Sequence, residues 1–85
     1  MPELSRFYGI IIAIYYDEHN PPHFHARYNE YKISIEINNF AIIDGSLPPK
    51  AYGLVTEWAL IHKEELLENW NLAKEGKVLK KINPL

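Results

Sequence analysis

Histidine is the residue type in this sequence with the clearest capacity for chemistry. The chain of 85 residues has four histidines and no cysteine, and three of the histidines (His19, His23 and His25) fall within seven residues. His23 and His25 are two positions apart, so in a β-strand their imidazoles lie on the same face. Neutral imidazoles together with the nearby carboxylate of Asp17 or Glu18 form a ligand set that suits Zn, Fe or Ni. We therefore expect His19, His23 and His25 to be ligands of a divalent metal ion.

The same histidines fit other roles. Protonatable imidazoles can hold an anion or a substrate phosphate, or act as general acid and base in the cleavage of RNA or another ester. For such catalysis the candidates are His23, His25 and His62. A structural role, in which histidines hydrogen-bond to loop carbonyls, is the remaining interpretation. No serine or threonine has the sequence context of an activated nucleophile.

Composition excludes several classes of protein. Without cysteine there is no disulfide scaffold, thiolate zinc site, iron–sulfur centre or cysteine nucleophile. Nine basic and eleven acidic residues give a net charge of −2, which argues against nucleic-acid binding over the whole surface. Lysines near the end of the chain form a basic cluster that we expect to be solvated, with contact to nucleic acid as the weaker alternative. The length predicts one domain over 1–85, with 77–85 as a C-terminal tail.

No segment predicts insertion into a membrane. The first residues lack the basic stretch and long apolar run of a secretory signal. The longest apolar stretch, Tyr8–Tyr16, has nine residues, about half the length that a membrane-spanning helix needs. We therefore expect a cytoplasmic protein with no membrane contact.

The first half of the chain has the composition of a β-sheet. The predicted strands are 8–16, 24–28, 31–37 and 40–43. Asn29-Glu30 stands where a two-residue hairpin turn fits, and Pro21-Pro22 interrupts the sheet because proline lacks an amide donor. These segments predict an antiparallel meander of about four strands.

The second half predicts one long helix. From Ala51 the apolar residues recur every three or four positions, and Gly76 marks the end of a helix of about 25 residues. Ser46 is the predicted cap. A kink or break near His62 is the alternative, and the position of His62 on the apolar stripe is more typical of a core residue than of a ligand. Together the halves predict an α+β fold, a sheet covered on one face by this helix.

The first predicted strand is apolar on both faces, whereas one helix covers only one face of a sheet. The other face needs cover from the tail, from a second copy or from another protein. We therefore expect a homo-oligomer or a complex with a small partner protein.

Several motifs resemble the bacterial family called domain of unknown function 4160. They are Arg6-Phe7, Gly9-Ile10, His19-Asn20-Pro21-Pro22-His23-Phe24-His25, Gly45-Ser46-Leu47-Pro48-Pro49, Glu57-Trp58, His62, Glu65-Leu66, Asn69-Trp70 and Ile82-Asn83-Pro84-Leu85. The resemblance implies no established reaction. It does imply a small protein of a kind that is sometimes encoded beside another small protein, as in toxin–antitoxin pairs. It also places His62 in one recurrent set with the loop histidines, which implies a pocket shared by all four.

Two functional hypotheses follow. The first is an interaction or regulatory module that works with a partner protein in a toxin–antitoxin-like pair. The alternative is a histidine- or metal-dependent hydrolase that acts on a phosphate ester such as RNA through His19, His23 and His25. The hydrolase requires the imidazoles to converge on a common point.

Overall fold

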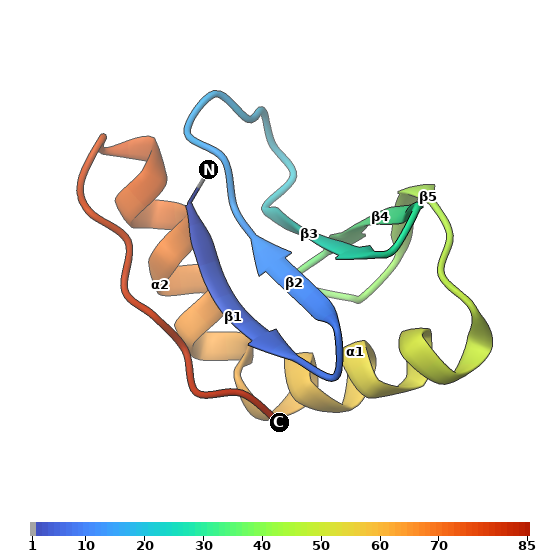
Figure 1. Ribbon diagram of the computed structural model, residues 1–85. Coiled ribbons are helices and arrows are strands. Elements are labelled where there is room, and N and C mark those ends of the chain that lie inside the picture. The colour runs from blue at the N-terminus through green and yellow to red at the C-terminus, as the bar shows by residue number, and fades with distance from the viewer. Residues whose placement is uncertain (1) are drawn as a thin grey trace.

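Five antiparallel strands follow one another in chain order, each paired with the next, and two helices follow the last strand (Figure 1). The computed structural model describes residues 2–85. Its elements are β1 (Glu3–Phe7), β2 (Ile10–Ala13), β3 (His23–Tyr28), β4 (Tyr31–Glu36), β5 (Ile42–Gly45), α1 (Pro49–Ile61) and α2 (Lys63–Lys74). The predicted α+β class is confirmed, with five strands in place of about four and two helices in place of one.

The N-terminal hairpin differs from the predicted first strand. A strand over 8–16 is wrong at both ends: Tyr8 (φ 50°) and Gly9 (φ 80°) form the turn between β1 and β2, and β2 ends at Ala13. The strand that was not predicted is β1, which pairs with β2 from Glu3 to Phe7. Its sequence mixes charged and apolar residues and has no run of β-branched residues, so local composition does not mark it as a strand.

The hairpin of β3 and β4 forms as predicted. Tyr28 pairs with Tyr31, and Asn29 adopts the left-handed conformation (φ 54°) that a tight hairpin turn requires. The last strand begins later than predicted, at Ile42, because Phe40 (φ 58°) belongs to the preceding turn.

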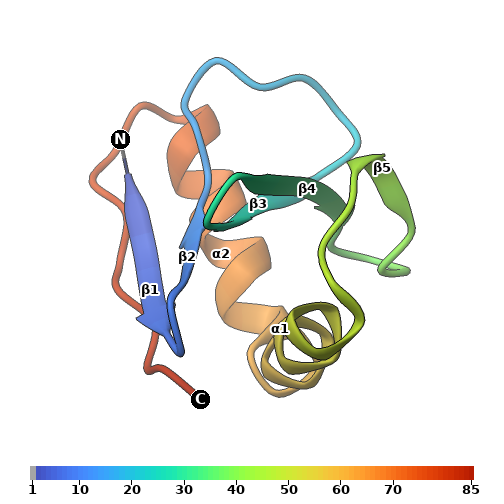
Figure 2. The same ribbon diagram turned by 45° about the vertical axis from the view of Figure 1, so that its right-hand side comes forward.

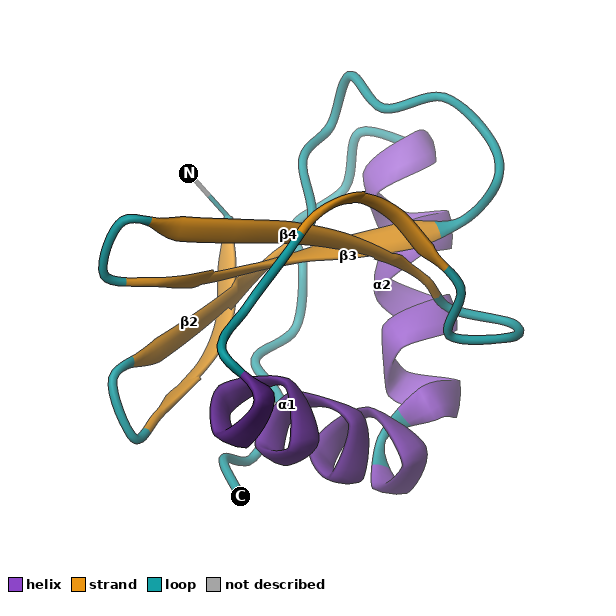
Figure 3. Cartoon of the chain, turned by 90° about the vertical axis from the view of Figure 1, so that its right-hand side faces the viewer, coloured by secondary structure: helices purple, strands orange, loops and turns teal. Residues whose placement is uncertain are grey.

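The helical half breaks at His62, so the prediction of one continuous helix is wrong and its alternative is confirmed. His62 has φ −112° and ψ 25°, between α1 and α2, and the two helices run in clearly different directions (Figure 3). The amide of His62 donates to the carbonyl of Trp58 at 3.1 Å, and the amide of Leu66 donates to the carbonyl of His62 at 2.9 Å. The backbone groups at the break therefore remain hydrogen-bonded.

The ends of the helical half agree only in part with the sequence. Ser46 does not cap α1, because its amide donates to the carbonyl of Lys32 at 3.0 Å and the N-cap position is Pro48. Pro49 occupies the first helical turn, where its missing amide is tolerated. Gly76 (φ 71°) follows the end of α2, as predicted.

The core lies between the sheet and the helices. The Trp58 ring is 5.5 Å from that of Phe7 and 6.3 Å from that of Phe24, measured between centroids. Residues 77–85 run beside β1 (Figures 1 and 2). There the amide of Ile82 donates to the carbonyl of Leu4 at 2.9 Å, and the Trp58 indole donates to the carbonyl of Asn83 at 2.8 Å. No helix within residues 2–85 combines the length and apolar character needed to cross a membrane.

Candidate metal centre

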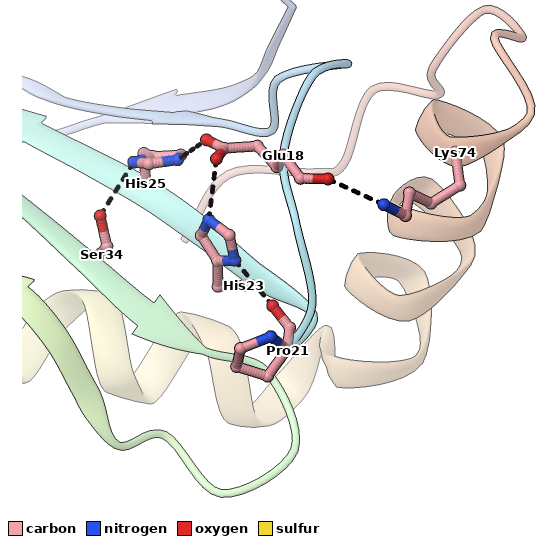
Figure 4. A network of polar contacts seen from close by, with 6 residues as sticks. All are labelled: Glu18, Pro21, His23, His25, Ser34 and Lys74. Atoms are coloured by element: carbon pink, nitrogen blue, oxygen red, sulfur yellow. Dashed lines mark hydrogen bonds and ion pairs between the residues drawn. The ribbon is translucent and has the colours of Figure 1, made fainter.

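The loop between β2 and β3 is held from the opposite end of the chain. Lys74 Nζ, near the end of α2, donates to the backbone carbonyl of Glu18 at 2.8 Å (Figure 4). The Tyr16 hydroxyl donates to the carbonyl of Lys77 at 2.9 Å. These contacts fix the loop so that the Glu18 side chain turns toward the start of β3.

Glu18 meets two histidines there, both from β3. Its Oε1 forms a short contact with His25 Nε2, and its Oε2 lies 3.3 Å from His23 Nε2. One ligand atom from each of the three residues lies within 4.8 Å of the others. His23 and His25 share a face of β3, so strand geometry places both rings beside one carboxylate.

The outer nitrogens of both imidazoles are already engaged, which orients the inner ones. His23 Nδ1 donates to the carbonyl of Pro21 at 2.7 Å, so a neutral His23 carries its lone pair on Nε2, facing Glu18. His25 Nδ1 shares a hydrogen bond of 3.0 Å with Ser34 Oγ. Metal-binding histidines almost always have such a partner on the second nitrogen, which fixes the ring and its tautomer.

Aromatic rings enclose the cluster on two sides. The His23 ring lies 5.1 Å from that of Trp70 on α2, and the His25 ring lies 4.7 Å from that of Tyr15. The side chain of His23 is 10% exposed, that of Glu18 24% and that of His25 26%. The cluster is therefore largely enclosed but still reachable from solvent at the Glu18–His25 side.

The electrostatics of the cluster keep its carboxylate ionised. Burial raises the pKa of Glu18, but the hydrogen bond and charge of His25, with those of His23, outweigh burial, so the pKa lies below its ordinary value of 4.5. An ionised carboxylate and two imidazoles are the ligands of many zinc sites and of iron(II) sites with two histidines and one carboxylate. Two ligands bound tetrahedrally at about 2.1 Å from one ion lie about 3.4 Å apart, close to the separation of Glu18 from His23.

Residues 9–71 match the family described as domain of unknown function (DUF4160). The chain belongs to this family. No curated protein and no solved structure matches it. The matched region of the DUF4160 chain includes Glu18, His23, His25 and Ser34, whereas Lys74, which holds the Glu18 backbone, lies beyond it.

The four predicted histidines are not brought to one place. His19 is exposed. In the described part of the DUF4160 chain, the cluster of possible metal ligands contains Glu18 instead of His19. His62 lies at the helix break, with Nδ1 2.5 Å from Glu65 Oε1 and its ring 5.3 Å from that of Trp58. The hydrolase hypothesis needed convergence of the imidazoles, and the cluster around Glu18 contains only two of them, His23 and His25.

Sequence reasoning missed Ser34 as a site residue, although a signal for it existed. Once Asn29 is placed in a two-residue turn, the register pairs Tyr28 with Tyr31 and therefore His25 with Ser34. Residues directly opposite one another on neighbouring strands have adjacent side chains. The predicted hairpin was thus sufficient to place a hydroxyl beside His25.

A larger groove of the described chain lies away from this cluster. It has a volume of about 530 Å³, lies between the start of α1 and the β1–β2 turn, and has mostly apolar walls that include Ile10 and Leu54. Its charged side chains are Lys50 and Glu57, and no histidine lines it. The histidines of the cluster therefore do not contribute to this groove.

Proposed function

We propose that this DUF4160 protein binds one divalent metal ion, with zinc or iron(II) as the best match, through Glu18, His23 and His25. The observation that carries the proposal is the direction of the imidazole nitrogens. The carbonyl of Pro21 takes the proton on His23 Nδ1, so Nε2 of a neutral His23 faces Glu18 Oε2 at 3.3 Å with a lone pair. Two acceptors at this distance require a cation between them, which is either a proton or a metal ion.

A metal ion satisfies this cluster better than protons do. Protons on both inner nitrogens would make His23 an imidazolium cation, because its Nδ1 already donates to Pro21, whereas His25 would stay neutral with Ser34 Oγ donating to its Nδ1; His23 is only 8% exposed. Burial of the His23 imidazolium is costly. One divalent ion supplies two positive charges that all three ligands share.

Three protein ligands leave room at a zinc or iron ion for water or a substrate atom, and such an ion polarises what it binds. The chain's own contribution is to orient the ligands. Pro21 and Ser34 fix the two rings, and Lys74 fixes the Glu18 backbone.

Calorimetric titration of untagged, chelator-treated protein with Zn²⁺ tests the proposal. We expect one ion per chain and a rise in Kd of at least about 100-fold for Glu18→Gln or His23→Ala, since the loss of an outer-shell partner alone costs about 10- to 100-fold. His19→Ala is the matched control, because this histidine is exposed and outside the cluster. Absence of stoichiometric binding, or an equal loss in His19→Ala, would refute the proposal.

A second candidate function, an interaction module, is favoured by the free edge of β5. The opposite edge strand, β1, is accompanied by the segment that contains Ile82, whereas the outer edge of β5 faces no strand among residues 2–85. Ile42 and Ile43 of β5 are 51% and 48% exposed. Unpaired strand edges with apolar side chains pair readily with another chain. We propose that a second copy pairs with this edge about a two-fold axis.

Light scattering during size-exclusion chromatography tests the second candidate. We expect a dimer for the natural sequence and a monomer for Ile43→Lys, which places a charge on the edge. Leu60→Lys is the control, because Leu60 is also exposed, at 66%, but lies on α1. A monomer for the natural sequence would overturn this assembly, and a complex that forms only with a different small protein would replace the second copy by that partner.

A further inference from the structure

A small hollow lies next to the proposed metal site, on the sheet face opposite the core. It has a volume of about 80 Å³, and its lining includes His25, Tyr15, Arg27 and Lys32. Ala13 lies opposite His25 in the sheet and forms part of the apolar wall of the hollow. One of the metal ligands is therefore also part of the hollow.

Two positive charges face each other across this hollow. Arg27 follows His25 by two residues on β3, so both side chains project from the same face about 7 Å apart. Lys32 is the partner of Arg27 in the register of β3 and β4. Like charges directly opposite one another destabilise a sheet unless an anion compensates them.

No carboxylate of residues 2–85 forms an ion pair with either cation. The register also places Glu36 and Asp44 on this face, opposite His23 and Ser34, and Glu18 contacts His25. Glu3, on β1, forms its ion pair with Arg6 at 2.8 Å. The hydrogen bond with Arg6 is the main cause of the lowered pKa of Glu3, to which Arg27 adds only a minor effect. Arg27 and Lys32 thus remain available to an external anion.

The size of the hollow limits the ligand group. A water molecule takes about 30 Å³ of liquid volume, so the hollow holds the equivalent of two or three waters. That is enough for a compact oxyanion head group but not for a nucleobase or a sugar. The body of a larger ligand has to lie outside, over the exposed sheet face.

We propose that this hollow binds the phosphate group of a phosphomonoester, held by Arg27 and Lys32 beside the metal site. A phosphate has enough oxygens to meet a guanidinium, an ammonium and a metal ion together, and its double negative charge matches the two side-chain cations. A carboxylate has two oxygens and one charge, so it matches this set less well. This proposal rests on the proposed metal function only for the contact between the phosphate and the metal ion.

Titration with phenyl phosphate, followed by calorimetry and by backbone amide NMR shifts, tests this inference. The protein is used both metal-free and loaded with one equivalent of Zn²⁺. We expect saturable binding in both forms, tighter with zinc, and a loss of at least about tenfold for Arg27→Gln and for Lys32→Gln, as expected for a charge-assisted hydrogen bond. Arg6→Gln is the matched control, because Arg6 lies on the same face but is paired with Glu3.

The outcomes separate this inference from the metal proposal. If zinc does not bind but metal-free protein still binds phenyl phosphate through Arg27 and Lys32, the metal proposal fails and the anion site stands. If zinc binds but phenyl phosphate shows no saturable binding, or if Arg27→Gln binds it like the natural sequence, the anion site is refuted. Benzoate binding as tight as that of phenyl phosphate would refute the assignment to phosphate.

Discussion

The substitution Ile82→Ala tests whether residues 77–85 belong to the folded core. The segment has several lysines and no regular secondary structure, yet Ile82 is only 3% exposed and packs in the main hydrophobic cluster. The change removes three carbon atoms, which accounts for about 2.4 kcal/mol at about 0.8 kcal/mol per buried CH₂ group. A residual cavity adds to this, so we expect the free energy of unfolding to fall by about 3 kcal/mol.

This loss is large for a chain of 85 residues. At about 2.1 cal/mol/K per residue the entropy of unfolding is about 0.18 kcal/mol/K, so Tm falls by about 17 °C. Thermal and urea unfolding followed by circular dichroism measure both quantities. Val78→Ala is the matched control, because Val78 is in the same segment but 86% exposed, and its expected effect is under about 0.5 kcal/mol.

The two variants together decide the point. If Ile82→Ala were no more destabilising than Val78→Ala, the segment would not be packed on β1 as described, and the reasoning would fail. A large effect of Val78→Ala would equally contradict the burial assigned here. The result also bears on the candidate metal site, because the carbonyl of Lys77 in the same segment accepts the hydrogen bond from Tyr16 in the β2–β3 loop.

Four further predictions concern single residues, each measured by urea unfolding. Gly45→Ala is expected to destabilise the fold by at least about 2 kcal/mol, because Gly45 has φ +79° and a Cβ would lie 2.1 Å from the Lys32 carbonyl oxygen. Gly53 lies on α1, where a Cβ would meet open space, so Gly53→Ala is expected to stabilise the fold by about 0.5–1 kcal/mol. Glu18→Gln is expected to destabilise the metal-free protein when the pH is above the ordinary carboxyl pKa of 4.5. The difference in stability between the variant and the natural sequence vanishes as the pH falls through the lowered pKa of folded Glu18. Asn69→Ala is expected to cost about 1–3 kcal/mol, because Asn69 is buried and bridges two backbone groups, at 2.7 and 3.0 Å. An unchanged unfolding midpoint for Gly45→Ala or Asn69→Ala, or a pH-independent effect of Glu18→Gln, would contradict the corresponding argument.

The β3–β4 hairpin was predictable because its signals are local. Asn29 in the turn and the alternation of apolar and polar residues over 31–37 both depend on neighbours in sequence. Once the turn is placed, the register follows, and with it the contact of His25 with Ser34. This part of the site was therefore within reach of sequence reasoning.

The N-terminal strand and the C-terminal segment were not predictable in this way. β1 is a strand because it pairs with β2, and Ile82 is buried because it packs beside β1. Both are contacts between distant parts of the chain. The local sequence of each segment is mostly polar or mixed, and tertiary contact overrides such weak propensity.

The break at His62 was predicted only as the alternative to one continuous helix, for a different reason. The buried residues of α1 and α2 keep the same spacing on both sides of the break, from Val55 and Trp58 to Leu66 and Trp70. A periodic pattern reports which face of a helix is buried, but it does not report whether the axis turns between two buried turns. Two helices that each cover their own part of the core give the same pattern as one straight helix.

The choice of Glu18 over His19 as the third member of the cluster comes from distant contacts. Both residues lie in the β2–β3 loop, and the histidine is the more frequent metal ligand. The Glu18 backbone is held by the hydrogen bond from Lys74, 56 residues away, while its carboxylate contacts His23 and His25 on β3. Since His23 also contacts Trp70 on the same helix, α2 supports both the carboxylate and one imidazole. The geometry of the cluster therefore depends in part on the docking of α2, so we expect the proposed metal binding to be coupled to the folding of the C-terminal half.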